Sequence, residues 1–220
     1  MTTILRIDAS ARTAASQSRA LGDYFENAWK KHDPNAQVTR RDLAKESIPH
    51  IADQTIVGYY TPAEQMTAEL RAATALSDRL IAELQAAEVF LLTVPMYNFS
   101  MPSALKAWID QIVRMGYTFS YDGQNFGGLV KVKQVYVLCA YGAGGYTDGG
   151  PFSAYNFLEP YLKSLLGFLG IPDVQFIAVQ ATTADTASVA NNMVIAKRQI
   201  DTAIAIQFNV QNQQTQGAFS

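Results

Sequence analysis

The 220-residue sequence contains few of the residues that metal sites and disulfide scaffolds require. Its single cysteine, Cys139, excludes an internal disulfide, and the sequence has only two histidines, His32 and His50. These three residues are far apart and do not show the spacing of zinc ligands, so we expect no metal site. A chain without disulfides fits a reducing compartment, and we therefore expect a cytoplasmic protein.

An excess of charge of one sign and long apolar runs are also absent. The 17 basic and 19 acidic side chains give a net charge of -2, and no basic run of the kind that binds nucleic acid occurs. No apolar stretch reaches the roughly 18 residues of a transmembrane helix. The first residues lead directly into a strand pattern without a secretion leader. We therefore expect neither nucleic acid nor a membrane as a partner.

Three common active-site motifs are missing as well. The sequence has no G-x-S-x-G, which disfavours a serine hydrolase with a nucleophile elbow. It has neither G-x-G-x-x-G nor G-x-x-x-x-G-K-[ST], which disfavours the usual dinucleotide-binding and P-loop sites. Any ligand site must therefore be built from other residues.

Apolar runs rich in β-branched residues alternate with segments of helical periodicity. Strands are predicted at residues 4–7, 37–41, 89–94, 135–139 and 174–178. Helices are predicted at residues 16–32, 61–84, 104–114, 155–168 and 189–208, and a small β excursion at residues 117–123. This alternation predicts a single α/β domain over residues 1–210, with a doubly wound parallel sheet of five strands flanked by helices. Residues 211–220 are polar and predict a flexible C-terminal tail.

The start of the second helix has a clear sequence signal. Thr61 followed by Pro62, with Glu64 three residues after the threonine, predicts a capped helix start. Residues 47–60 then form a long crossover loop, and loops of this length are often functional.

A rigid turn with two aromatic side chains and an amide follows the third predicted strand. Its residues are Pro95, Met96, Tyr97, Asn98 and Phe99. Ligands of open α/β sheets bind at the carboxyl ends of the strands, near the point where the strand order reverses. The turn therefore suits a flat heteroaromatic ligand, although the same rings would also serve simply to cover the core.

The loop after the first predicted strand carries small hydroxyl side chains and a cation. It contains Ser10, Arg12, Ser16, Gln17 and Ser18 and runs directly into a helix. Free backbone N–H groups at a helix N-terminus favour a bound anion, so the loop predicts a phosphate site. The alternative is that Ser16 and Ser18 only cap the helix.

A third loop, at residues 140–150, holds five glycines. It begins with Ala140, Tyr141, Gly142, Ala143, Gly144 and Gly145. Glycine permits close approach of the backbone to a ligand, and the tyrosines would line a ring or a substrate, whereas an isolated glycine-rich stretch is more often a flexible surface loop. Because all three loops follow parallel strands, we expect them to meet at one edge of the sheet.

Taken together, these residues resemble the FMN-dependent NADH-azoreductases of the flavodoxin-like NAD(P)H:quinone oxidoreductase group. The resemblance covers nearly the whole chain. It rests on Ser10 with residues 16–18, on residues 95–106, on Gly116-Tyr117-Thr118-Phe119, and on residues 160–162 and 166–171.

The resemblance implies a flavodoxin-like fold and a homodimer with one FMN at each subunit interface. It implies that Ser10, Ser16, Gln17 and Ser18 bind the phosphate and that Met96, Tyr97, Asn98 and Phe99, with Pro95 before them, surround the isoalloxazine ring. It also implies two-electron ping-pong hydride transfer from NADH (or NADPH) through FMN to azo compounds and quinones, with no catalytic side chain. Tyr121 and Phe168 would be walls over the flavin of the opposite subunit, unless they serve only in packing.

The third loop departs from the family pattern. The family has Ser-Arg-Gly-Gly after the fourth strand, where this chain has residues 140–145 and a longer loop behind them. We expect this loop to reach the flavin with its glycines and to reshape the substrate side. The alternative function is a flavodoxin-type electron carrier or a flavin-binding protein, in either case without NAD(P)H turnover. The balanced charge offers no acidic docking surface of the kind that a carrier uses.

Overall fold

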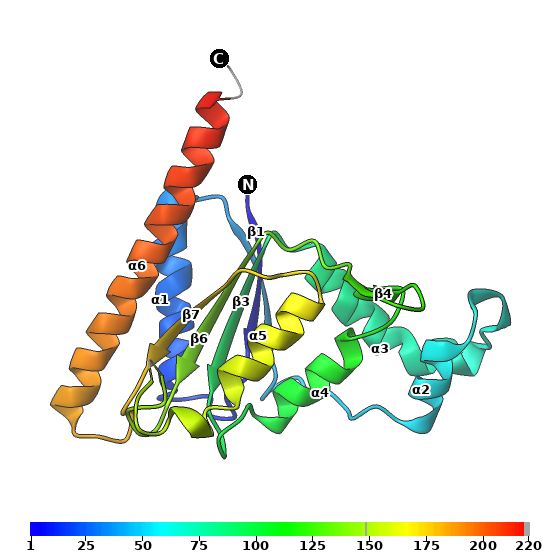
Figure 1. Ribbon diagram of the computed structural model, residues 1–220, viewed down its shortest axis with the longest axis horizontal. Coiled ribbons are helices and arrows are strands. Elements are labelled where there is room, and N and C mark those ends of the chain that lie inside the picture. Colours follow the sequence, from blue (N-terminus) through cyan, green and yellow to red (C-terminus); the bar gives the residue numbers. More distant parts are fainter. Residues whose placement is uncertain (148, 218–220) are drawn as a thin grey trace.

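A computed structural model describes residues 1–147 and 149–217 (Figure 1). Five parallel strands form the central sheet in the order β2-β1-β3-β6-β7. The strands are β1 (Thr3–Asp8), β2 (Gln37–Asp42), β3 (Val89–Pro95), β6 (Gln134–Ala140) and β7 (Val174–Val179). The strand order reverses between β1 and β3, as in flavodoxin, so the crevice at their carboxyl ends is the expected ligand site. The predicted doubly wound sheet is confirmed.

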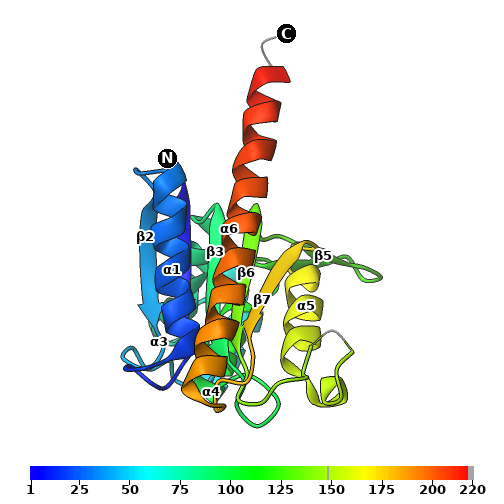
Figure 2. The same cartoon turned by 90° about the vertical axis from the view of Figure 1, so that its left-hand side faces the viewer.

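Helices cover both faces of the sheet (Figure 2). The helices are α1 (Gln17–His32), α2 (Asp53–Tyr60), α3 (Ala68–Gln85), α4 (Ser103–Ile112), α5 (Leu158–Phe168) and α6 (Thr186–Gly217). One hydrophobic core joins α1 and α6 to the sheet, and the other joins α3, α4 and α5 to its opposite face. None of the described helices has the combination of length and apolar content that crossing a bilayer requires.

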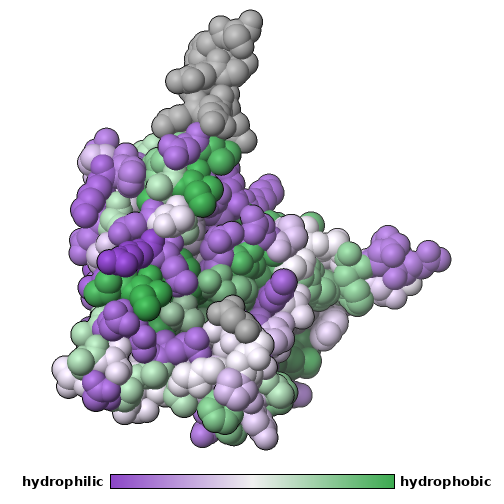
Figure 3. Space-filling view, turned by 60° about the vertical axis from the view of Figure 1, so that its left-hand side comes forward, coloured by the Kyte–Doolittle hydropathy of each residue, from purple (hydrophilic) through white to green (hydrophobic). Residues whose placement is uncertain are grey.

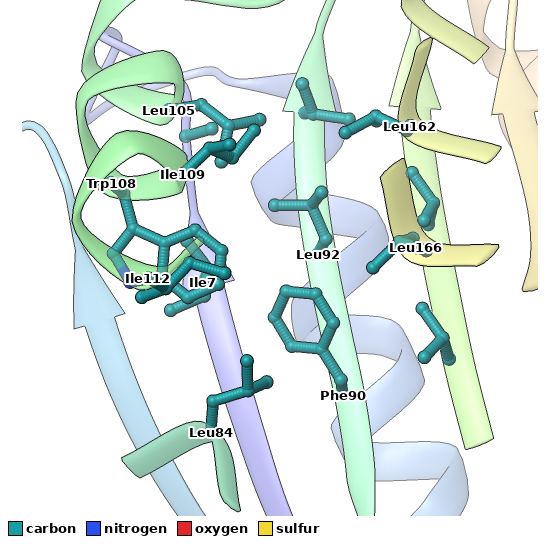
Figure 4. Close-up of a cluster of buried hydrophobic side chains, with 14 of the residues drawn as sticks. Ile7, Leu84, Phe90, Leu92, Leu105, Trp108, Ile109, Ile112, Leu162 and Leu166 are labelled. Carbon is teal, nitrogen blue, oxygen red and sulfur yellow. The ribbon is translucent and has the colours of Figure 1, made fainter. Parts of the chain in front are cut away.

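Strand β3 shows how the two cores share the sheet. Phe90, Leu92 and Val94 face the core formed with α3, α4 and α5, and Val89 and Leu91 face the core formed with α1 and α6. Figure 4 shows Phe90 and Leu92 between the side chains of α4 and α5. Because both faces are buried, the strand is continuously apolar, as parallel strands are.

The predicted start of the long helix was wrong. Thr61 ends α2, and Pro62 is extended (φ -55°, ψ 148°) before a short 3-10 helix at Ala63–Gln65. The N-cap of α3 is Thr67, whose hydroxyl accepts a hydrogen bond from the N–H of Leu70 at 3.2 Å. Thr67 is followed neither by a proline nor by a glutamate three residues on, so the local signal favoured Thr61. Residues 53–60, predicted as loop, form α2.

Two other element boundaries also differ from the prediction. Helix α5 begins at Leu158 rather than at residue 155, because the carboxamide oxygen of Asn156 accepts from the N–H groups of Leu158 and Glu159 at 3.2 Å. Helix α6 continues to Gly217, past the predicted end at residue 208. Residues 218–220 of the predicted flexible tail lie outside the described residues, and the flexibility of the tail stays a prediction.

The predicted β excursion is a hairpin of β4 (Phe119–Tyr121) and β5 (Phe126–Gly128). Its turn is held by the Asp122 carboxylate, which accepts from two backbone N–H groups at 2.8 and 2.7 Å. The hairpin contacts the C-terminal end of α5, since the N–H of Val130 donates to the carbonyl of Leu169 at 3.1 Å. It therefore lies near the amino-terminal ends of the strands, away from the crevice.

A buried charge cluster lies between β1 and α1. Arg6 is 2% exposed, and its guanidinium donates to Asp8 at 3.0 Å, to Asp23 at 2.8 Å and to Glu26 at 2.9 Å. Glu26 is also 2% exposed and accepts from Arg40 at 2.8 Å. Because each buried charge has an opposite partner, the cluster fixes how α1 lies against the sheet.

Gly22 leaves the space that this cluster fills. A Cβ at this position would stand 2.6 Å from Cγ2 of Thr93 and 2.8 Å from the Arg6 guanidinium. Gly22→Ala is therefore expected to lower the free energy of unfolding by about 1–3 kcal/mol through overpacking, despite the better helix propensity of alanine. Urea denaturation of the apoprotein measures this, with Gly167→Ala in α5 as the control, since a Cβ there meets nothing within 4 Å. Equal or higher stability of Gly22→Ala would contradict the expected close contact.

Candidate cofactor site

Four loops at the carboxyl edge of the sheet enclose a cavity of about 200 Å³. Its lining comes from the loops after β1, β3, β6 and β7. The lining residues are Ser10, Arg12, Ala15, Ser16, Gln17, Ser18, Pro95, Met96, Tyr97, Ala140, Gly142, Thr182 and Thr183. The three loops singled out in the sequence therefore meet at one edge, as predicted.

The first loop ends in an anion-binding helix start. Ser16 is the N-cap residue of α1, yet its hydroxyl makes no capping bond and lies 3.3 Å from the hydroxyl of Ser18. The N–H groups of Gln17, Ser18 and Arg19 donate to no acceptor in the part of the chain that the structure describes. Hydroxyls and free N–H groups together at a helix N-terminus suit a phosphate, so the interpretation of the serines as simple caps is not supported.

Arg12 adds positive charge at the same opening. Its side chain is exposed, and it forms no salt bridge with the described residues. An unpaired guanidinium beside a helix N-terminus increases the attraction for a dianionic phosphate.

Arg19 fixes the other end of the first loop. Its guanidinium donates to the backbone carbonyl of Ser10 at 2.7 Å and to both carboxylate oxygens of Asp42 at 2.7 and 2.6 Å. These hydrogen bonds from Arg19 lower the pKa of Asp42, so the pair stays ionised at neutral pH. Ser10, which is 1% exposed, is therefore held at the cavity through its backbone carbonyl by a partly buried ion pair.

The turn after β3 presents two free amides. Tyr97 and Ser100 exchange backbone hydrogen bonds of 2.8 and 3.0 Å, and the two residues between them are left-handed, with φ of 48° at Asn98 and 69° at Phe99. Two left-handed residues form a type I′ turn, which non-glycine residues adopt at a cost. The N–H groups of Asn98 and Phe99 pair with no acceptor among the described residues. The turn thus offers two donors beside the cavity wall formed by Tyr97.

In the glycine loop after β6, backbone carbonyls are hydrogen-bonded while several backbone N–H groups are free. The carbonyls of Tyr141, Gly142 and Ala143 accept from the N–H groups of Thr182, Thr183 and Ala181, at 3.0, 3.1 and 3.2 Å in that order. The N–H groups of Gly142, Ala143 and Gly144 have no acceptor within residues 1–147 and 149–217. The loop is therefore held from behind by the segment after β7.

Tyr141 does not line the cavity, contrary to the prediction. Its side chain is fully buried in the core and donates to Glu159, while Asn156 donates to its oxygen at 3.4 Å. Burial, followed by the nearby Cys139 and Glu159, raises the pKa of Tyr141 far above its usual range. The alternation of side chains along β6 sends residue 141 inward, to the face that Cys139 shares. Cys139 is fully buried and packs in this core.

The remaining predicted residues lie around the cavity rather than in its lining. Asn98 and Phe99 are exposed next to it, with Phe99 46% exposed, and Ala143, Gly144 and Gly145 lie further along the glycine loop. The sequence reasoning missed Thr182 and Thr183. They lie in the loop that follows β7, so the rule that ligands bind at the carboxyl ends of strands, applied to the fifth strand, would have found them.

Tyr121 and Phe168 lie in an aromatic cluster at the opposite end of the sheet. Phe168 packs against Phe119 and Phe126 at ring-centroid distances of 4.8 and 5.4 Å, and Tyr121 stacks on Phe126 at 4.7 Å. Within one chain they do not reach the cavity. Tyr121 and Phe126 are 48% and 62% exposed, so this cluster is available to a second subunit.

The polar groups around the cavity match the phosphate and the ring of FMN. The start of α1 would bind the phosphate, and the turn at Asn98 and Phe99 and the glycine loop would offer N–H groups to the polar edges of the ring. The cavity is smaller than the roughly 300–1,000 Å³ of pockets that enclose a drug-sized ligand. Part of the flavin would therefore lie over the exposed turn.

Comparison with known proteins agrees with this site. The flavodoxin-like fold family matches residues 2–204. A protein of Xanthobacter autotrophicus named FMN-dependent NADH:quinone oxidoreductase is 53% identical over 175 residues, which cover 80% of this chain and 84% of that protein. A Trichormus variabilis protein, FMN-dependent NADH:quinone oxidoreductase 2, is 40% identical over 205 residues and covers 93% and 99% of the two chains.

A solved structure with the same fold contains the cofactor. The FMN-dependent NADH-azoreductase of Bacillus anthracis, determined in complex with FMN, superposes with a TM-score of 0.82 at 23% identity and covers 94% of this chain and 99% of that one. At this identity the similarity establishes the fold. Together with the sequence matches, it shows that the chain belongs to the flavodoxin-like fold family and, within it, to the FMN-dependent NADH:quinone oxidoreductases.

Proposed function

We propose that this protein is an FMN-dependent oxidoreductase that uses NADH to reduce quinones and azo compounds. The observation that carries the proposal is the convergence of an anion-binding helix start and a turn with two free amides at one edge of the sheet. The names of the relatives support the donor, the cofactor and the acceptor class. Two-electron ping-pong transfer suits a single open site, because NADH gives up its hydride and leaves as NAD⁺ before the acceptor enters.

The residues of the chain bind and orient the cofactor. Ser10, Ser16 and Ser18 would donate hydroxyl hydrogen bonds to the phosphate, and the first-turn N–H groups of α1 would add to them. When bound, FMN supplies the hydride acceptor and donor. The free N–H groups of Asn98 and Phe99 lie where they would stabilise negative charge on the ring edge.

The glycine loop would act at the other polar edge of the ring. The free N–H groups of Gly142, Ala143 and Gly144 offer donors to the pyrimidine side of the flavin, where negative charge also develops on reduction. No side-chain acid or base is required, because water can protonate a reduced quinone or azo group.

A homodimer would complete the site. In each chain the exposed aromatic residues Tyr121 and Phe126 lie far from that chain's own cavity, while Phe99 and Tyr155 are exposed beside it. Exposed aromatic clusters of this kind are typical of interfaces. Tyr121 and Phe168 of one subunit would then form a wall over the flavin of the other.

Light scattering is expected to give twice the 24.1 kDa of one chain, and a monomer at micromolar concentration would contradict this arrangement. We place the enzyme in the cytoplasm, since Cys139 forms no disulfide.

The function can be tested on the purified protein. It is expected to bind FMN in preference to FAD, and anaerobic NADH is expected to bleach the flavin absorbance within a single-turnover mixing experiment. Addition of a benzoquinone or an azo dye should restore the absorbance, and NADPH in place of NADH measures the donor preference. Failure to bind FMN would refute the proposal. Binding without bleaching by either nucleotide would instead identify an electron carrier.

A further inference from the structure

Gln180 connects three elements behind the glycine loop. The residue follows β7, and its carboxamide oxygen accepts from the N–H groups of Gly145 and Tyr146, both at 3.0 Å. Its carboxamide nitrogen donates to the Thr147 hydroxyl at 2.7 Å. Its backbone carbonyl accepts from the side chain of Asn192 in α6 at 3.0 Å. One side chain therefore fixes three successive residues of the loop.

These contacts hold the loop at the point where it reverses direction. Gly145 has a φ of 88°, and its carbonyl accepts from the N–H of Phe152 at 2.9 Å, so the chain returns on itself there. The N–H groups of Gly145 and Tyr146 point back to Gln180, while those of Gly142, Ala143 and Gly144 are free. The direction of the free amides thus depends on where the loop turns.

We propose that Gln180 is a positioning residue that holds the glycine loop so that its free N–H groups face the pyrimidine edge of the flavin. The proposal rests on the proposed function and deepens it, since it names the residue that holds the loop in which this chain departs from the family pattern. Gln180 does not line the cofactor cavity and acts on the flavin only through the loop.

Loss of the carboxamide has a defined consequence. Two backbone N–H groups and the Thr147 hydroxyl lose a common partner, and the loop samples other conformations. Preorganised donors stabilise the reduced flavin more than the oxidised flavin, because negative charge develops on the ring upon reduction. Gln180→Ala is therefore expected to weaken the binding of both oxidised and reduced FMN, and to weaken the binding of reduced FMN more strongly.

Gln199 provides a matched control. Gln180 and Gln199 line the same cavity of about 410 Å³ beside β7 and α6, and the Gln199 side chain makes no hydrogen bond with the described residues. Figure 3 shows polar and apolar surface intermixed on the side of the molecule that carries α6, and Gln199 is exposed. Gln199→Ala thus removes the same kind of side chain from the same cavity without releasing the loop.

The experiment compares Gln180→Ala, Gln199→Ala and Gln180→Glu with the unmodified protein. In Gln180→Ala, the Kd of oxidised FMN is expected to rise about tenfold, as for the loss of one or two net hydrogen bonds. The Kd of reduced FMN is expected to rise about tenfold more, which lowers the two-electron midpoint potential by about 30 mV. Gln199→Ala is expected to match the unmodified protein in both. Gln180→Glu keeps the acceptor oxygen, so it is expected to restore the affinity for oxidised FMN.

Hydrogen exchange of the apoprotein gives a readout that does not involve FMN. The amides of Gly145 and Tyr146 are expected to exchange faster in Gln180→Ala only, with protection restored in Gln180→Glu. Unchanged exchange, or faster exchange with an unchanged midpoint potential, would overturn the proposal. If the unmodified protein fails to bind FMN, the proposed function fails, whereas the exchange result still decides whether Gln180 holds the loop.

Discussion

Replacing Ser16 by aspartate is expected to weaken FMN binding by about 100-fold or more while the apoprotein stays as stable as before or becomes more stable. Ser16 is the N-cap residue of α1, and its hydroxyl makes no capping bond. A carboxylate there would accept from the free first-turn N–H groups and complement the helix dipole. The same carboxylate would occupy the donors and repel the dianionic phosphate by several kcal/mol at about 4 Å and an effective dielectric near 20. Titration of the apoprotein with FMN, together with urea denaturation, measures both effects.

Ser16→Asn separates the effect of the negative charge from the effect of occupying the first-turn N–H groups. Asparagine also caps helices well but carries no charge, so its Kd for FMN is expected to rise less than that of the aspartate variant. The expected difference between the two variants should shrink at high salt, because part of the repulsion is screened near the surface. Normal FMN binding by Ser16→Asp would show that the phosphate does not bind at the start of α1.

Glu26→Ala is expected to cause the largest loss of stability, about 3–5 kcal/mol, because it leaves the buried guanidinium of Arg6 with incomplete neutralisation. Glu26 accepts from Arg6 at 2.9 Å and from Arg40 at 2.8 Å, and both Glu26 and Arg6 are 2% exposed. A loss of that size is a large part of the 5–15 kcal/mol typical of a folded domain. Urea denaturation of the apoprotein measures it. The control is Glu46→Ala, since Glu46 pairs with Arg41 from an exposed position and its removal is expected to cost less than about 1 kcal/mol.

The same carboxylate predicts how stability changes with pH. Burial of Glu26 opposes its ionisation, but hydrogen bonds from Arg40 and Arg6 outweigh burial and lower its pKa in the folded protein. A lowered folded pKa means that the stabilisation is complete above the unfolded value of about 4.3 and is lost as the pH falls through the folded value. Denaturation midpoints measured from pH 7 to pH 3 should therefore fall less steeply for Glu26→Ala. Parallel curves for the two proteins, or a loss of stability near that of Glu46→Ala, would contradict the buried pairing.

Sequence patterns predicted best where burial itself sets the pattern. Strands such as β3 are covered on both faces, so their apolar runs appear directly in the sequence. Boundaries set by a single hydrogen bond were less predictable. Thr61 carries the stronger local capping signal, with Pro62 and Glu64 after it, yet Thr67 is the residue that caps α3, the helix against which α2 packs.

In the candidate site, the position of the loops was predictable from the sequence and the roles of individual residues were not. The three loops were identified because ligand sites follow the carboxyl ends of parallel strands, and the cavity joins them. Residues within those loops were harder to assign. Tyr141 was expected at the ligand, but the strand geometry of β6 continues through it and buries its ring. Thr182, Thr183 and Gln180 act through contacts between segments about 40 residues apart, which no local pattern encodes.

Local sequence was enough to predict the α/β class, the five strands of the sheet with helices between them (α2 excepted), and the three loops that carry ligand chemistry. These features follow from local periodicity and residue type, which act within a few residues. The tertiary structure alone decided which N–H groups are free, which tyrosine is buried, and that a residue after β7 holds the glycine loop after β6. The reason is physical, since an amide is free or paired according to what the rest of the fold brings beside it.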